Sequence, residues 1–282
     1  MQIIIGKTAG FCFGVKNAVD NTIEELNKGK EVYCLGELVH NKQVTEELIS
    51  KGVIFIDNIE EAKNIAIIRA HGVPKEVYEK AEKLQIELKD LTCPKVLAIH
   101  KLAIKYNKEN YYIFLVGQKT HPETIGTASF CGEDSSIIEG VEEIKTAVEK
   151  FKKSNLENVV VLAQTTISLE KFNKIVEELK KHIENIEIKN TICASTKQRQ
   201  EETAEISKKV ECMIIVGGKH SSNSNKLYEL AKENCKNVFF AETKEDLEIE
   251  KIKKFKSIGI MAGASTPQKS VSEIVDIIEK TC

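Results

Sequence analysis

Short apolar runs rich in β-branched residues recur along the whole chain and predict about twelve strands. They lie at 2–6, 30–36, 53–57, 66–70, 86–91, 111–117, 135–140, 159–164, 186–191, 212–218, 238–242 and 257–263. Stretches of helical period separate most of them, as at 169–179 and 224–234. This alternation of strand and helix favours parallel sheets with crossover helices.

In chain order the strands form three sets of four, which predicts three similar α/β units. We expect an α/β fold with mainly parallel four-stranded sheets about a pseudo-threefold axis and one shared site at the centre. The expected units are 13–92, 93–191 and 192–282, with residues 1–12 as a leading strand and cysteine turn.

The polar turns of the three sets repeat at fixed distances. The first turn of each set holds a cysteine, at Cys12, Cys93 and Cys193. A polar residue follows each cysteine after 28 positions, at His40, His121 and Ser221. A third polar residue follows the second one after 44 positions in two sets, from His121 to Thr165 and from Ser221 to Ser265. In the first set the corresponding distance, from His40 to His71, is 31 positions. Such a period indicates a repeated structural unit.

The three cysteines are candidate metal ligands. Thiolates favour soft metals and iron–sulfur clusters, and a helix N-terminus stabilises an anionic ligand. A cluster held by three cysteines would keep one iron open to a substrate. Zinc bound by three cysteines and a histidine is the alternative.

A second group of residues at strand ends and helix starts could bind phosphate through imidazole, hydroxyl and amide groups. These residues are His40, His71, His121, Ser221, Ser222, Asn223 and Ser265. Helix capping by Ser222, Asn223 and Ser265 is the alternative. Glu123 could carry a proton, with Thr165 or Thr166 as relay, or could simply favour the start of a helix.

Composition narrows the classes of function. The chain is 30% charged with a formal net charge of -2 and has no basic stripe, which argues against nucleic acid as a partner. No apolar run is long enough to span a membrane, and the first residues resemble no export signal. We therefore expect a cytoplasmic monomer. Of the eight cysteines, we expect no role in the site for Cys34, Cys212, Cys235 and Cys282.

Taken together, the motifs resemble the 4-hydroxy-3-methylbut-2-enyl diphosphate reductase (LytB) family over essentially the whole chain. They are Gly10-Phe11-Cys12-Phe13-Gly14-Val15, Arg69-Ala70-His71-Gly72, Thr92-Cys93-Pro94, His121-Pro122-Glu123, Gln164-Thr165-Thr166, His220-Ser221-Ser222-Asn223-Ser224-Asn225 and Ala262-Gly263-Ala264-Ser265-Thr266-Pro267. Phe13 and Lys226 depart from the residues common in the family, and neither is a candidate ligand.

The resemblance implies an enzyme that removes the hydroxyl group of an allylic diphosphate with two electrons and two protons. Cys12, Cys93 and Cys193 would hold a [4Fe-4S] cluster, Glu123 would supply a proton, and Thr165 would position the hydroxyl. The phosphate-binding group defined above would bind the diphosphate. Ferredoxin or flavodoxin would donate electrons, since no nucleotide-binding loop is present.

Two other classes also suit three α/β units around three cysteines. One is a dehydrating enzyme similar to quinolinate synthase, which would need no reductant. The other is a cluster-based sensor or a zinc-stabilised anion-binding protein. Arg69 and Arg199, the only arginines, each stand beside a predicted site turn, and we expect them to orient those turns.

Overall fold

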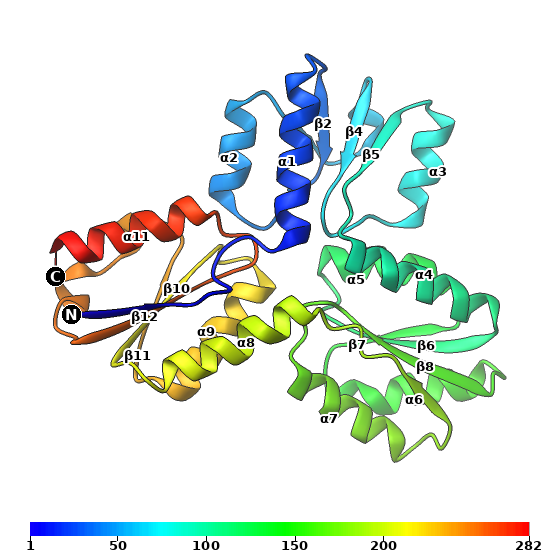
Figure 1. Ribbon diagram of the computed structural model, residues 1–282. Helices are drawn as coiled ribbons and strands as arrows, with labels where there is room; N and C mark the ends of the chain where they lie inside the picture. Colours follow the sequence, from blue (N-terminus) through cyan, green and yellow to red (C-terminus); the bar gives the residue numbers. More distant parts are fainter. Residues whose placement is uncertain (282) are drawn as a thin grey trace. The chain divides into compact units, whose positions relative to one another are not determined.

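Figure 1 shows a computed structural model of the chain, which describes residues 1–281; Cys282 lies outside the described residues. All the predicted strands are present. Within the described residues they form three parallel four-stranded sheets, which confirms the predicted fold class. Sheet A has the order β1 (Gln2–Ile5), β12 (Ser257–Ala262), β10 (Cys212–Val216), β11 (Asn237–Ala241). Sheet B has the order β3 (Ile54–Ile56), β2 (Val32–Leu35), β4 (Ile65–Ile68), β5 (Glu87–Asp90). Sheet C has the order β7 (Ser135–Ile138), β6 (Tyr111–Val116), β8 (Asn158–Ala163), β9 (Ile186–Ile188).

Grouping the strands four at a time in chain order was wrong by one strand, whereas the expected units 13–92 and 93–191 contain the strands of sheets B and C. Chain order places β1 with β2, β3 and β4, whereas β1 pairs in parallel with β12, with Gln2 opposite Ser257. In the same way, β5 closes sheet B beside β4, and β9 closes sheet C beside β8. Hydrophobic pattern identifies strands but carries no information about their partners, because every buried parallel strand looks alike.

The chain forms two compact units. Unit 1 comprises 1–16, 39–47 and 194–281 and contains sheet A, and unit 2 comprises 17–38 and 48–193 and contains sheets B and C. The boundaries of the three expected α/β units stay a prediction.

The helices are α1 (Phe13–Asn27), α2 (Lys42–Ser50), α3 (Lys75–Lys83), α4 (Pro94–Lys108), α5 (Pro122–Cys131), α6 (Ile144–Lys153), α7 (Leu169–Lys180), α8 (Ala194–Ser207), α9 (Ser222–Asn234), α10 (Ile249–Ile252) and α11 (Gln268–Thr281). Short 3₁₀ turns are η1 (Ile59–Glu61), η2 (Val141–Glu143) and η3 (Lys244–Asp246).

Sheets A and C each lie between two layers of helices. In sheet C, Phe114 and Val161 face α6 and α7, while Ile113 and Val160 face α4 and α5. In sheet A, alternate residues of β10 and β12 pack on α10 and α11 from one face and on α8 and α9 from the other. Since both faces are buried, both residue sets are apolar, which explains why these strands read as continuous hydrophobic runs.

Every helix within residues 1–281 is too short or too polar to cross a lipid bilayer.

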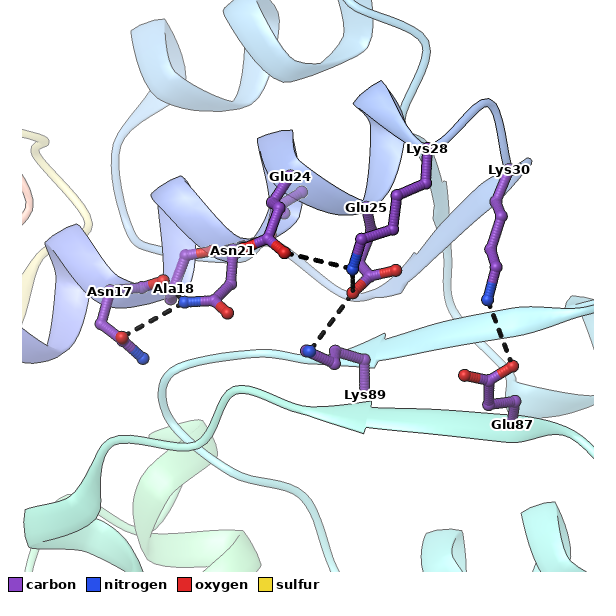
Figure 2. Close-up of polar contacts among 10 residues, drawn as sticks. Asn17, Ala18, Asn21, Glu24, Glu25, Lys28, Lys30, Glu87 and Lys89 are labelled. Carbon is purple, nitrogen blue, oxygen red and sulfur yellow. Dashed lines mark hydrogen bonds and ion pairs between the residues drawn. The ribbon is translucent and has the colours of Figure 1, made fainter.

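A buried carboxylate ties α1 to the edge of sheet B in unit 2 (Figure 2). Glu25 is 4% exposed, and its Oε1 lies 2.9 Å from Lys28 Nζ and 3.2 Å from Lys89 Nζ on β5. Its neighbour Glu24 is exposed and shares Lys28 at 3.2 Å. The hydrogen bond from Lys28, reinforced by Lys89, holds the pKa of Glu25 below its ordinary value despite burial.

We predict that Glu25→Gln lowers the free energy of unfolding by about 1 kcal/mol at pH 7, a modest value because its lysine partners are half-exposed and screened. Since the folded pKa is depressed, this stabilisation is present above the ordinary glutamate pKa and is lost as the pH falls through the lowered pKa of the folded state. Urea unfolding at pH 7 and at pH 3 measures both effects. Glu24→Gln is the matched control; an equal loss in the two variants would contradict the assignment.

Candidate functional site

Each of the three candidate cysteines stands between the edge strand of a sheet and the first residue of a helix. Cys12 follows β1 and precedes α1, Cys93 follows β5 and precedes α4, and Cys193 follows β9 and precedes α8. The carbonyls of Cys12 and Cys93 accept hydrogen bonds from Lys16 and Leu97 in the first helical turns. The thiols therefore stand at the partially positive ends of helices.

The same backbone hydrogen bond holds all three cysteines. Each cysteine N–H donates to a carbonyl just beyond the strand that neighbours the edge strand, at 3.0 Å in every case: Cys12 to Ala264, Cys93 to Ala70 and Cys193 to Thr165. The turns after β12, β4 and β8 are thus equivalent in the three sheets. This equivalence is the structural basis of the spacing seen in the sequence.

Exposure separates these cysteines from the other described ones. Cys12, Cys93 and Cys193 are partly exposed, whereas the remaining cysteines up to residue 281 are buried, and none of the cysteines in that range forms a disulfide. Burial raises the pKa of Cys34, Cys131 and Cys212 to about 12. Those thiols stay protonated and do not suit metal binding. Accessible thiols at helix N-termini are the donors that an iron–sulfur cluster requires, so the residues fit the cofactor.

Glu123 is a buried acid at the start of α5. It is 2% exposed. Its Oε1 accepts from Thr165 N, and its Oε2 accepts from Thr165 Oγ1, both at 2.6 Å. The Thr165 carbonyl in turn accepts from the N–H of Cys193. A carboxyl group, a hydroxyl group and a candidate metal ligand are thereby joined through one residue of unit 2.

Burial raises the pKa of Glu123 to about 7, although both hydrogen bonds from Thr165 favour the carboxylate and act in the opposite direction. Desolvation is the larger effect because the carboxyl is closed off from water. A carboxyl with this pKa holds a proton in a large fraction of molecules at neutral pH and can release it, as general acid catalysis requires.

His121 and His71 lie together in unit 2. His121 is the N-cap of α5, and its Nδ1 accepts from Glu123 N at 3.1 Å. Since Nδ1 acts as an acceptor, the neutral ring carries its proton on Nε2, which is then a donor. The rings of His71 and His121 make an edge-on contact with centroids 5.5 Å apart. His121 therefore caps the helix that carries Glu123.

In unit 1 the serine-rich turn begins α9. Ser221, not Ser222 or Asn223, is the N-cap, because its Oγ accepts from Ser224 N at 3.3 Å. Asn223 therefore lies in the first helical turn, where both polar atoms of its amide are buried with no hydrogen-bond partner. Buried amides in proteins are almost always satisfied. Asn223 thus fits ligand binding better than capping.

His40 meets two turns of sheet A in unit 1. Its backbone carbonyl accepts from Ser265 Oγ at 3.0 Å, so the Ser265 side chain holds this turn and does not cap α11. The same carbonyl lies so close to Gly218 that a Cβ there would be 2.7 Å away. Only glycine fits this approach, which explains Gly218 ahead of the serine turn.

The structure therefore gathers the predicted residues into two sets, one in each unit. Unit 1 holds Cys12, His40, Ser221, Ser222, Asn223 and Ser265, and unit 2 holds His71, Cys93, His121, Glu123, Thr165 and Cys193. The roles of these residues stay predictions.

Gln164 belongs to the Gln164-Thr165-Thr166 motif, but the sequence predicted no role for its side chain. It is 1% exposed, and its Oε1 accepts from Gln118 N at 2.9 Å and from Thr124 Oγ1 at 3.1 Å. Its Nε2 donates to Thr166 Oγ1. One amide thus fixes the turns after β6 and β8 on either side of Glu123. A lone glutamine at a strand end gives no such signal in the sequence.

The fold and these turns define a class: a protein of three parallel α/β sheets, with a cysteine turn at the edge of each sheet and a buried acid beside one of them. Comparison with known proteins gives the family. The family model described as LytB protein matches residues 3–279, and the chain belongs to this family.

Two curated relatives match over nearly their full length. A protein of Clostridioides difficile is 40% identical over 99% of both chains, and one of Thermoanaerobacter sp. is 38% identical over 98% of this chain and 96% of its own. Both are named 4-hydroxy-3-methylbut-2-enyl diphosphate reductase. The solved Plasmodium falciparum E-1-hydroxy-2-methyl-but-2-enyl-4-diphosphate reductase is 30% identical with a TM-score of 0.91, covering 98% of this chain and 87% of that one. A second solved structure, described as the terminal enzyme of the non-mevalonate pathway, is 38% identical with a TM-score of 0.74, covering 99% of this chain and 100% of that one.

We predict that the raised pKa of Glu123 lowers stability as the pH rises. Between the ordinary pKa of 4.5 and about 7, the folded protein holds a proton that the unfolded chain has released. The free energy of unfolding therefore falls by about 3 kcal/mol across this window and is flat above it. Glu123→Gln is uncharged and lacks this fall, so its stability relative to the parent chain should rise between pH 5 and pH 8.

Urea unfolding of the metal-free protein at these two pH values measures the difference. Glu149→Gln, at an exposed position of α6, is the control for mutation of a glutamate as such. A constant difference between Glu123→Gln and the parent chain would show that the carboxyl titrates normally.

Proposed function

We propose that this chain reduces 4-hydroxy-3-methylbut-2-enyl diphosphate to isopentenyl diphosphate and dimethylallyl diphosphate, the last step of the non-mevalonate pathway. The reaction consumes two electrons and two protons and releases the substrate hydroxyl as water. Family membership gives the substrate class. The observation that carries the chemistry is the buried Glu123 carboxyl, bound at both oxygens to Thr165.

The serine turn of unit 1 would bind the diphosphate. The N-terminus of α9 presents backbone N–H groups and partial positive charge. The Asn223 amide, buried without a protein partner, would donate to a phosphate oxygen, and the hydroxyl of Ser222 would add a further donor. Ser265 would contribute by holding the His40 turn through its hydrogen bond to the His40 carbonyl. The imidazoles of His40, His71 and His121 would complete the binding group.

Glu123 would supply a proton to the departing hydroxyl through Thr165. In the ionised state Thr165 Oγ1 donates to Glu123 Oε2. When Oε2 carries the proton, it can donate to Thr165 Oγ1, whose own proton then turns toward the substrate. The proton moves along a hydrogen bond that already exists, so no side chain has to change position.

Cys12, Cys93 and Cys193 would hold a [4Fe-4S] cluster through three of its irons. When bound, such a cluster supplies electrons one at a time and a Lewis-acidic iron. The hydrogen bonds from the three cysteine N–H groups fix the turns, and the helix N-termini place partial positive charge beside the thiols. A small carrier such as ferredoxin or flavodoxin would deliver the electrons.

We predict that anaerobically purified protein contains about four irons and four sulfides per chain, the composition of one such cluster. Mössbauer spectra should show one distinct iron that changes when the allylic diphosphate is added. Cys93→Ser should lose most of the iron, while Cys131→Ala, at a buried thiol, should keep it. Zinc in place of iron, or a cluster indifferent to the diphosphate, would refute the proposed function.

We predict that Glu123→Gln lowers kcat by at least about 100-fold, the effect expected for loss of a general acid. Iron content and diphosphate binding should be unchanged, because the amide has nearly the same shape. In the parent chain kcat should fall as the pH rises above about 7, since the acid form is required. Anaerobic turnover with a chemical reductant measures both effects.

Glu149→Gln again serves as the control and should retain full turnover. Turnover of Glu123→Gln at the parental rate would remove Glu123 from the mechanism. Turnover of the parent chain without reductant would instead indicate a dehydrating enzyme.

A further inference from the structure

The turn that carries Cys12 is held by two side chains of a single helix. Arg199 and Glu202 stand three residues apart on α8 and therefore lie on the same face of that helix. Both contact residues 7–10, which lead from β1 to Cys12 and lie 189 positions or more away in the chain. All of these residues belong to unit 1.

Arg199 binds the carbonyls of this turn. The residue as a whole is 2% exposed. Nε donates to Thr8 O at 3.0 Å, and Nη2 donates to Thr8 O at 2.6 Å and to Gly10 O at 2.9 Å. Two carbonyls two residues apart are thus bound by one planar group. A lysine ammonium can keep the charge but cannot reproduce this rigid fork.

Glu202 binds the N–H groups of the same turn. Its Oε1 accepts from Lys7 N at 2.6 Å, and its Oε2 accepts from Thr8 N at 2.9 Å and from Thr8 Oγ1 at 2.5 Å. These donors outweigh burial and hold the pKa of Glu202 below its ordinary value, so the carboxylate is charged at neutral pH. Acceptors and donors of one short segment are therefore bound from the same side.

We call Arg199 and Glu202 the clamp; the backbone of the turn that they hold is itself constrained at two glycines. A Cβ on Gly6 would overlap Met261 Sδ, and Gly10 has a φ of +106°, a conformation open to glycine. The other two cysteine turns are held locally instead. Thr92 N and Oγ1 donate to Asp90, and Thr191 Oγ1 bonds to the backbone of Ala163. The clamp is thus specific to Cys12.

We propose that Arg199 and Glu202 are positioning residues for Cys12, and that they keep its thiol in the orientation needed to hold a metal cluster. Arg199 stands in the helix that begins directly after Cys193, yet its guanidinium binds the turn of a different cysteine. The proposal rests on the proposed function only in taking Cys12 as a cluster ligand.

The test compares Glu202→Gln and Arg199→Lys with the parent chain. Glu201→Gln, an exposed glutamate one position away, is the matched control. Metal-free protein is treated with iodoacetamide, and the alkylation rates of Cys12 and Cys93 are read by mass spectrometry. Trypsin places these two cysteines in separate peptides, so Cys93 is an internal reference within the same molecule.

Both clamp variants should raise the Cys12 rate relative to Cys93 about ten-fold, the factor that corresponds to about 1.4 kcal/mol of lost hydrogen bonding. After reconstitution with iron and sulfide, both should also lose iron to a chelator faster than the control, with an altered EPR signal of the reduced cluster. Circular dichroism confirms that the variants are folded.

A Cys12 to Cys93 ratio equal to that of Glu201→Gln in both variants would overturn the clamp. The two proposals fail separately. If the parent chain takes up no cluster, the proposed function fails, while the alkylation ratio in metal-free protein still decides whether Arg199 and Glu202 position Cys12.

Discussion

The hydrogen bond from each cysteine N–H to the end of the neighbouring strand is the constraint on which the site depends. It occurs at Cys12, Cys93 and Cys193 with the same length. In a parallel sheet the carboxyl ends of all strands lie at the same end of the sheet. The turn after the outermost strand therefore lies next to the turn after its neighbouring strand. One backbone contact therefore places a thiol beside the polar residues of the next turn. The same hydrogen bond occurs in each of the three sheets.

The chemistry differs among the three turns although the backbone is the same. Beside Cys193 the neighbouring turn holds Thr165, and through it the buried Glu123. Beside Cys12 the corresponding turn holds Ala264 and then Ser265, which binds the His40 carbonyl. Beside Cys93 it holds Ala70 and then His71. The same backbone arrangement thus carries a buried acid beside one cysteine, and a serine or a histidine beside the other two.

Much of this could be predicted from the sequence, for physical reasons. Buried parallel strands are continuous apolar runs, so all of them were found, and the cysteine spacing reflects a repeated backbone contact. The pairing of β1 with β12 was not predicted, because the hydrophobic pattern of a strand does not specify its partner. The cap of α9 was placed one residue late, since Ser221, Ser222 and Asn223 are all suitable cap residues. Glu202 was missed because its contacts lie nearly two hundred residues away, and Arg199 was expected to orient the turn beside it in the chain.

The pairing of β1 with β12 has a consequence for synthesis on the ribosome. Sheets B and C consist of strands that are consecutive in the chain, so each can form soon after its last strand emerges. The strand β1 must instead wait for residues 257–262, which are made about 250 residues later. The Cys12 turn follows β1 and bonds to the turn after β12, so it is translated early but takes its place only after sheet A closes. The Cys93 and Cys193 turns depend only on strands of sheets B and C and can form earlier in synthesis.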